Sequence, residues 1–155
     1  EPLSMIVIDL DRFKAINDGH GHAIGDKVLE RFGAAAHHVL RESDLVGRMG
    51  GEEFAIVLPG STAPAAMVVA ERIRNAFAEA CRDCGAEDLN PTLSGGIADT
   101  TLDGHASLDR IYARADEALY RAKDEGRDRI VLAVRQPAAP AEQKPAAAPE
   151  AAQAA

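Results

Sequence analysis

Short apolar runs rich in β-branched residues recur along the chain and predict five β-strands. They cover residues 5–8, 45–49, 54–58, 92–98 and 130–134. The first run stops abruptly at an aspartate, which is typical of a buried strand whose carboxyl end reaches solvent. Two adjacent glycines in the fourth run are expected to weaken that strand.

Apolar residues at helical spacing predict three helices between these strands. The first is expected over about 26–41, after a loop rich in Asn, Asp, Gly and His, with Asp26 near the positive end of the helix dipole. The second begins near Pro64, because proline is favourable in a first helical turn. The third is expected to follow the capping residue Ser107 and to end near Gly126.

The order of these elements indicates an α+β fold. It matches the ferredoxin-like βαββαβ core, followed by an additional C-terminal helix and strand. A tight hairpin turn at residues 50–53 joins the second and third strands. In this topology the third strand lies between the first and the second and runs antiparallel to the first. Asp9 and Asp11 are therefore expected beside Glu52 and Glu53.

Length, composition and net charge indicate a single globular domain. Residues 1–135 fit one globular domain, and the Pro/Ala-rich segment 136–155 is expected to be a disordered tail. The formal net charge is −8, which disfavours nonspecific binding to nucleic acid or anionic lipid. No apolar run approaches the length of a membrane span. We expect a cytoplasmic domain, whether or not its parent protein is membrane-anchored.

The two cysteines, Cys81 and Cys84, form a single CxxC pair. A closed zinc site needs a second pair of ligands, and no strand leads into this pair as in thioredoxin-like motifs. The pair is therefore interpreted as two reduced thiols, with a redox or zinc role as the alternative.

The acidic residues expected at the strand ends indicate a divalent cation. Converging carboxylates repel one another unless a cation or a proton is shared among them. Mg²⁺ prefers oxygen ligands and is commonly held by one or two carboxylates together with substrate phosphates. The alternative is that these acids are solvated charges on loops. The glycine pair argues against this alternative, because Gly50 and Gly51 have no side chains that would block a phosphate or a base from approaching the backbone.

Together these residues resemble the GGDEF family of diguanylate cyclases, because residues 50–54 read GGEEF, a form of its signature. Further matching segments are Asp9-Leu10-Asp11-Arg12-Phe13-Lys14, Asn17-Asp18, Gly21-His22, Gly25-Asp26, Ser94-Gly95-Gly96-Ile97-Ala98, Ala115-Asp116-Glu117-Ala118-Leu119-Tyr120, Ala122-Lys123 and Gly126-Arg127. The resemblance covers roughly 4–134 in the right order and spacing. It implies an enzyme that condenses two GTP molecules into cyclic di-GMP and two pyrophosphates.

The resemblance implies a role for each acidic residue. Asp9, the backbone carbonyl of Leu10 and Glu52 would ligate Mg²⁺, for which Mn²⁺ is a possible substitute, and Glu53 would assist a second ion. The general base would be Glu52 or Glu53, and the sequence leaves that choice open because a metal-bound carboxylate can serve both roles.

Substrate contacts follow from the same resemblance. Asn17 and Asp26 match guanine-recognition positions, His22 matches a substrate contact, and Lys123 and Arg127 match positions that hold terminal phosphates. Gly50 and Gly51 would let the nucleotide approach the backbone. In isolation, Asn17 also fits a turn, Asp26 a helix start, and the two cations a solvated helix end.

Arg41 and Asp44 match the RxxD inhibitory site of the family, which implies feedback by cyclic di-GMP. Arginine can contact phosphate or a guanine edge in bidentate fashion. Arg72 is a candidate secondary contact for product held by a neighbouring subunit. The alternative for Arg41 and Asp44 is an ordinary surface ion pair.

The resemblance also implies a larger assembly. Two catalytic domains would face each other in a homodimer, brought together by a regulatory sensor domain in the parent chain. Family members carry an N-terminal helix and a DxLTGLxNR segment before the first strand, and this sequence starts after them, so part of the phosphate-side wall is expected to be missing. The competing functions are a noncatalytic cyclic di-GMP receptor and a cyclase with another nucleotide product.

Overall fold

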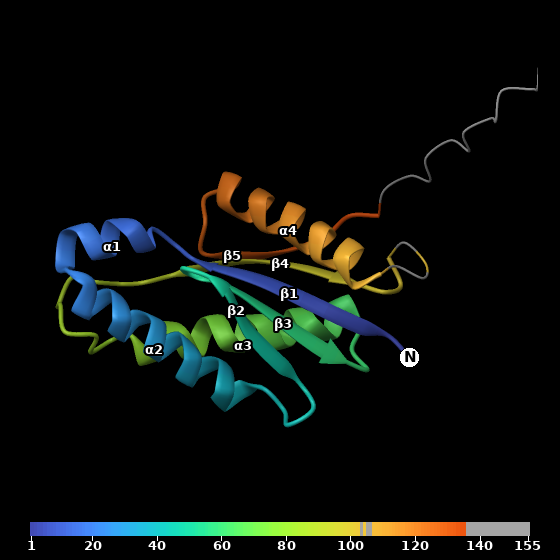
Figure 1. Cartoon of the computed structure of the whole chain (residues 1–155), viewed down its shortest axis with the longest axis horizontal. Helices are drawn as coiled ribbons and strands as arrows, with labels where there is room; N and C mark the ends of the chain where they lie inside the picture. The colour runs from blue at the N-terminus through green and yellow to red at the C-terminus, as the bar shows by residue number, and fades with distance from the viewer. Residues whose placement is uncertain (103, 105–106, 136–155) are drawn as a thin grey trace, which may run out of the picture.

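The fold is built around one five-stranded sheet with helices on both of its faces (Figure 1). The computed structural model describes residues 1–102, 104 and 107–135, so the expected tail at 136–155 lies outside the described residues. In chain order the elements are β1 (Leu3–Leu10), α1 (Phe13–His20), α2 (His22–Val39), β2 (Leu45–Gly50), β3 (Glu53–Pro59), α3 (Ala63–Ala80), β4 (Leu93–Asp99), α4 (Leu108–Asp124) and β5 (Arg129–Leu132).

The strands are arranged in the order β2-β3-β1-β4-β5. β1 is antiparallel to both of its neighbours, β3 and β4, whereas β4 and β5 are parallel. The third strand therefore lies between the first and the second, as the ferredoxin-like order predicted. The α+β class and the additional C-terminal helix and strand are confirmed.

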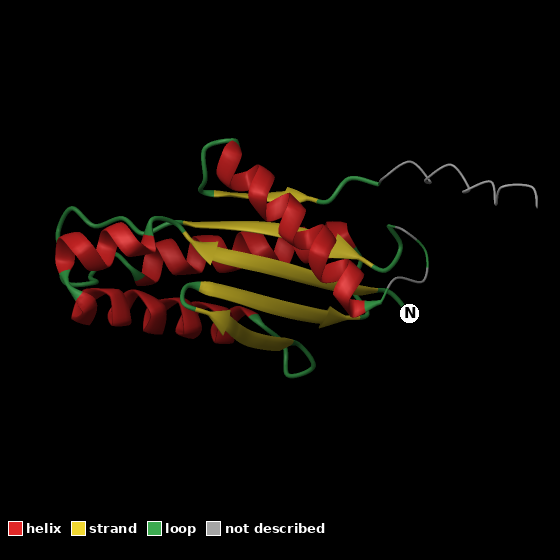
Figure 2. Ribbon diagram, turned by 45° about the horizontal axis from the view of Figure 1, so that its top comes forward, coloured by secondary structure: helices red, strands yellow, loops and turns green. Residues whose placement is uncertain are grey.

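The two faces of β1 belong to two different cores. Ile6, Ile8 and Leu10 point into the larger one, which is closed by α2 and α3. Met5 and Val7 point the other way and pack against α4. Figure 2 shows α4 crossing the sheet on the face opposite to the long helices. Alternation along a single strand thus places its odd-numbered residues on the α4 face.

Gly96 allows α4 to lie close to β4. A Cβ atom at this position would lie 2.0 Å from the carbonyl oxygen of Ala115 and 2.3 Å from the backbone nitrogen of Leu119. The glycine pair does not interrupt the strand, because β4 runs over Leu93–Asp99 and is buried along its whole length. The missing side chain is what permits the contact between helix and sheet.

The segment before the first expected helix differs from the prediction. It was expected to be a loop, but it forms α1, and α2 begins at His22 rather than near Asp26. Phe13 and Ile16 are buried, so packing overrides the weak helix propensity of the local Asn, Asp, Gly and His residues. Asp26 consequently lies beyond the first turn of α2 and is not at its positive end.

The other predicted helix boundaries agree with the structure. Pro64 lies in the first turn of α3, and the side chain of Ser107 accepts a hydrogen bond from the backbone nitrogen of Arg110 at the start of α4. Cys81 and Cys84 are buried free thiols at the end of α3, and burial raises the pKa of Cys81. No helix in the described part of the chain combines the length and the apolar character required to cross a bilayer.

Gly96→Ala is expected to destabilise the domain by about 2 to 3 kcal/mol, because α4 must move away from the sheet. Urea unfolding followed by circular dichroism measures this change. Gly33→Ala is the matched control, since nothing lies within 4 Å of a Cβ at that exposed helical position. The control should be neutral or slightly stabilising, and an equal loss in both variants would contradict the close approach as the cause.

Candidate active site

Asp9 and Glu53 lie directly opposite each other on neighbouring antiparallel strands. They are paired in the register of β1 and β3, and the backbone nitrogen of Leu10 donates to the carbonyl oxygen of Glu52 at 3.1 Å. Opposite residues in such a pair point to the same face, with their Cβ atoms about 5 Å apart. The expected convergence of the first strand end with the glycine turn is therefore present for these two carboxylates.

The turn that carries the acidic pair is short and held by its own residues. Gly51 has φ +51°, a left-handed conformation that favours glycine, and its carbonyl oxygen accepts from Nε of Arg48 at 2.7 Å. Glu53 is already the first residue of β3. The turn thus fixes the backbone of Glu52 and Glu53 relative to β1.

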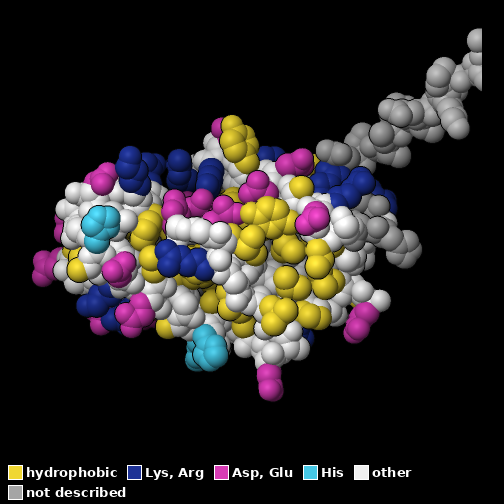
Figure 3. Space-filling view, viewed as in Figure 1, with side chains coloured by type: hydrophobic (Ala, Val, Ile, Leu, Met, Phe, Trp, Pro, Cys, Tyr) yellow, Lys and Arg dark blue, Asp and Glu magenta, His cyan; other side chains and the backbone are white. Residues whose placement is uncertain are grey.

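Lys123 brings a positive charge from α4 to the carboxylates. Its Nζ lies 2.6 Å from Oδ2 of Asp9, whose side chain is 15% exposed, whereas that of Lys123 is 36% exposed. Burial raises the pKa of Asp9, while the hydrogen bond and the charge of Lys123 act in the opposite direction and Glu52 and Glu53 add to the increase. Figure 3 shows the acidic side chains of this face gathered beside Lys and Arg side chains.

Two further α4 residues interact with Glu53, one by a hydrogen bond and one through its charge, and the sequence did not identify them as site residues. The hydroxyl of Tyr112 donates to Oε1 of Glu53, and this bond raises the pKa of Tyr112 to about 12. Burial, and next the charge of Glu53, raises the pKa of Asp116. Tyr112, Asp116 and Lys123 are spaced by four and seven residues, so their common helical face was a usable signal in the sequence.

The donor set consists of oxygen ligands that fit a hard divalent cation. Among the described residues no three His, Cys, Asp or Glu side chains form a ready metal site. Asp9 and Glu53 nevertheless face each other, and a lysine ammonium already partners Asp9. A hard cation held by one or two carboxylates, with phosphate and water completing its coordination, matches this arrangement.

The residues expected to read guanine lie at the corner between α1 and α2. Oδ1 of Asn17 is buried without a hydrogen-bond partner in the described residues. A Cβ at Gly25 would lie 1.7 Å from that atom, so the glycine provides the space that the amide occupies. Asp26 follows Gly25 on α2, and both Asp26 and His22 are exposed. A buried acceptor without a partner is satisfied by a hydrogen-bond donor from outside the described residues, such as a bound molecule or water.

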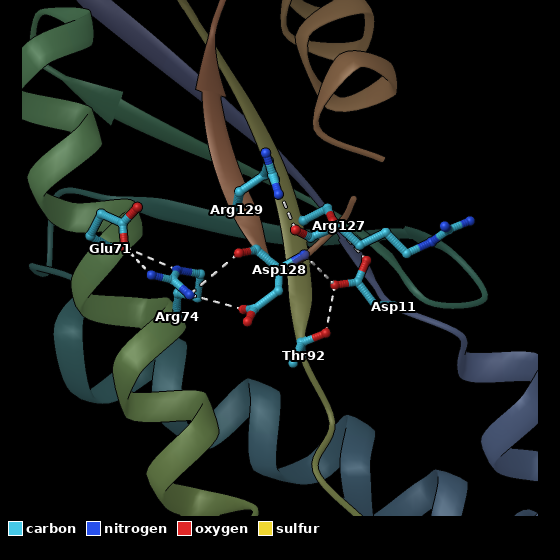
Figure 4. Close-up of polar contacts among 8 residues, drawn as sticks. Asp11, Glu71, Arg74, Thr92, Arg127, Asp128 and Arg129 are labelled. Carbon is cyan, nitrogen blue, oxygen red and sulfur yellow. Dashed lines mark hydrogen bonds and ion pairs between the residues drawn. The ribbon is translucent and has the colours of Figure 1, made fainter. Parts of the chain in front are cut away.

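Asp11 does not join the other acids, which differs from the expectation. Its buried carboxylate accepts hydrogen bonds from the hydroxyls of Thr92 and Ser94, both at 2.7 Å, and from the backbone nitrogen of Asp128 at 3.1 Å (Figure 4). These donors satisfy the carboxylate without a metal ion. Asp11 instead connects β1 to the turn that carries Arg127.

Arg41 and Asp44 form a bidentate pair at the end of α2. Nη2 and Nε of Arg41 lie 3.1 and 3.3 Å from the two carboxylate oxygens of Asp44. Both residues line a hollow of about 420 Å³. Arg72 lines a different hollow of about 410 Å³ between α2 and α3, so it does not complete the Arg41 hollow within one chain.

The sequence matches characterised proteins over most of its length. Residues 1–129 match the family described as Diguanylate cyclase, GGDEF domain. Diguanylate cyclase DgcP of Pseudomonas aeruginosa is 42% identical over 131 residues, which are 84% of this chain and 19% of that protein. Diguanylate cyclase A of Treponema denticola is 43% identical over 132 residues, 85% of this chain and 35% of that protein. The chain therefore spans only a minor part of these relatives.

Solved structures show the same architecture. The active GGEEF domain of a diguanylate cyclase from Vibrio cholerae is similar with a TM-score of 0.80 and 38% identity, covering 88% of this chain and 85% of that one. The GGDEF domain of DgcB from Caulobacter crescentus, solved in complex with c-di-GMP, gives a TM-score of 0.76 and 31% identity, with coverages of 85% and 78%.

Lys123→Met is expected to raise the pKa of the Asp9 carboxyl further above its ordinary value. The substitution removes a hydrogen bond and a positive charge that both favour the ionised form. Carboxyl carbon NMR over a pH series, recorded without divalent cations, measures the pKa directly. Lys27→Met, which removes an exposed lysine from α2, should leave that pKa unchanged. A downward shift in Lys123→Met would contradict the contact.

Proposed function

Since the chain belongs to the GGDEF domain family of diguanylate cyclases, we propose that it condenses two GTP molecules into cyclic di-GMP and releases two pyrophosphates. The observation that carries the proposal is the pairing of Asp9 with Glu53 across β1 and β3, at the turn that holds the GGEEF signature. Residues 1–135 then form the catalytic domain.

In this proposal the strand ends hold the metal ion and activate the nucleophile. Asp9, the carbonyl of Leu10 and Glu52 would hold Mg²⁺ or Mn²⁺, with Glu53 available for a second ion. When bound there, the ion would supply Lewis-acid polarisation of phosphate oxygens and of the attacking hydroxyl. Glu52 or Glu53 removes the proton from the ribose 3′-hydroxyl, which attacks the α-phosphate of the opposite GTP. Tyr112 orients Glu53 through its hydrogen bond.

The rest of the substrate is assigned to residues on the helices and on the turn after α4. Asp26 accepts from the N1–H and 2-amino groups of guanine, and Asn17 lies beside it with an unsatisfied acceptor. His22 provides a further substrate contact. Lys123 and Arg127 are assigned to the terminal phosphates, and Lys123 also pairs with the proposed metal ligand Asp9.

One chain provides half of the reaction centre in this proposal. Each GTP needs the 3′-hydroxyl of the other as its nucleophile, so two domains must face each other as a homodimer. Bringing the two bound nucleotides together supplies a large effective concentration. A regulatory sensor domain in the parent protein would control this meeting.

Product feedback is assigned to the Arg41 hollow. The Arg41 side chain is 60% exposed. Its Nε and Nη2 are held by Asp44, and Nη2 also contacts the Pro59 carbonyl and the Ser61 hydroxyl, so the N–H groups of Nη1 are the ones offered to cyclic di-GMP. Arg72, on the neighbouring hollow, is proposed to contact product held by the other subunit.

Incubation with GTP, with ATP and with both, in the presence of Mg²⁺, followed by mass identification of products, tests the activity. Glu52→Gln and Glu53→Gln should each lower turnover at least about a hundredfold, because a carboxylate needed for proton removal or metal binding is lost. The control is Glu79→Gln, which changes an exposed glutamate on α3. Undiminished cyclic di-GMP synthesis in both signature variants would contradict the assignment.

Arg41→Ala is expected to raise the concentration of cyclic di-GMP needed for half-inhibition about tenfold or more, since a charge-assisted bidentate contact is lost. The initial rate without product should stay the same, because Arg41 lies outside the proposed catalytic residues. GTP consumption with and without added product separates the two effects. Arg82→Ala, another exposed arginine with an acidic partner three residues away, is the control. Unchanged inhibition in Arg41→Ala would exclude the proposed feedback site.

A further inference from the structure

The turn between α4 and β5 has an unusual backbone. Gly126, Arg127 and Asp128 all have positive φ angles, of 122°, 66° and 48°. Glycine adopts such angles freely, but residues with a side chain do so only when the surrounding structure holds them. Two consecutive non-glycine residues in this conformation therefore need an explanation.

Two elements distant in sequence hold Asp128 from opposite directions. The carboxylate of Asp11, at the end of β1, accepts its backbone nitrogen at 3.1 Å. Nη1 of Arg74, on α3, lies 2.9 Å from Oδ1 of Asp128 and 3.5 Å from its carbonyl oxygen. Arg74 is in turn held by Glu71 through contacts of 3.0 and 2.9 Å. Figure 4 shows Asp128 between these two partners.

The backbone of Arg127 is held by hydrogen bonds, and these set the direction of its side chain. Its backbone nitrogen donates to the carbonyl of Ala122 at 2.9 Å, and its carbonyl accepts from Nε of Arg129 at 3.0 Å. With the following residue also fixed, the backbone on both sides of Arg127 is held. In Figure 4 the Arg127 side chain leaves the turn away from Arg74, so Arg74 influences it only through the backbone.

We propose that Asp11 and Arg74 are positioning residues that hold the 126–128 turn in its left-handed conformation and thereby aim Arg127 at the terminal phosphates of GTP. This inference rests on the proposed function for the role of Arg127. Asp11 follows Asp9 by two residues on the same strand end, so a single backbone segment fixes both the proposed metal ligand and the phosphate-binding turn.

Binding of 3′-deoxy-GTP with Mg²⁺ provides a test that does not depend on turnover, because this analogue lacks the attacking hydroxyl. Calorimetry would compare the wild type, Arg74→Met, Arg127→Ala and the double variant. Arg74→Met is expected to weaken binding about tenfold in the wild-type background and less than about twofold when Arg127 is already absent. Arg74→Lys should recover part of the affinity. Asp11→Asn, which keeps the size of the side chain, should show the same dependence on Arg127.

The controls separate positioning from general damage to the fold. Arg82→Met removes another α3 arginine that pairs with a glutamate three residues away, and it should have no effect. 3′-Deoxyguanosine monophosphate lacks the terminal phosphates, so its affinity should be the same in the wild type and Arg74→Met. An equal loss with and without Arg127, or an equal loss for the monophosphate, would overturn the proposal.

Failure of the proposed function gives a different result. A wild type that binds the analogue but forms no cyclic di-GMP from GTP contradicts the enzymatic activity and leaves the coupling between Arg74 and Arg127 measurable. If Arg127→Ala does not weaken binding, or if the wild type does not bind the analogue, the positioning role is excluded as well.

Discussion

The backbone pairing that holds β1 between β3 and β4 is the constraint on which the whole site depends. The register places Asp9 opposite Glu53, and the same strand end sends Asp11 to the turn after α4. A shift of one residue would move Asp9 to the opposite face of the sheet, among the apolar side chains packed under α2 and α3. The position of the carboxylates at the end of β1 is therefore determined by the backbone hydrogen bonds along the whole strand.

The site resolves its charge repulsion with protein groups from one helix. Lys123 neutralises Asp9, and Tyr112 donates to Glu53, so both carboxylates are supported from α4. Gly96 is what brings that helix close enough to the sheet. The close packing at Gly96 and the ion pair between Lys123 and Asp9 thus depend on the same helix, α4.

The sequence predicted the strands, the third strand between the first and the second, and Asp9 beside the glutamates of the glycine turn, because short apolar runs and the ferredoxin-like topology determine these features. It did not predict α1, where burial of Phe13 and Ile16 outweighs local propensity. It also placed Asp11 with the wrong partners, since its hydroxyl donors lie some eighty residues away. Contacts of this kind depend on side-chain direction, which alternation alone does not supply beyond the end of a strand.

The central position of β1 limits how this domain can be controlled. A strand with hydrogen-bonded neighbours on both edges opens only when much of the sheet opens with it, which requires a free energy near that of global unfolding. A small local rearrangement therefore changes the distance between Asp9 and Glu53 very little. In the proposed reaction between two domains, the quantity left to vary is how often, and in which orientation, two rigid copies of this surface meet, so the rate would follow the frequency of that encounter.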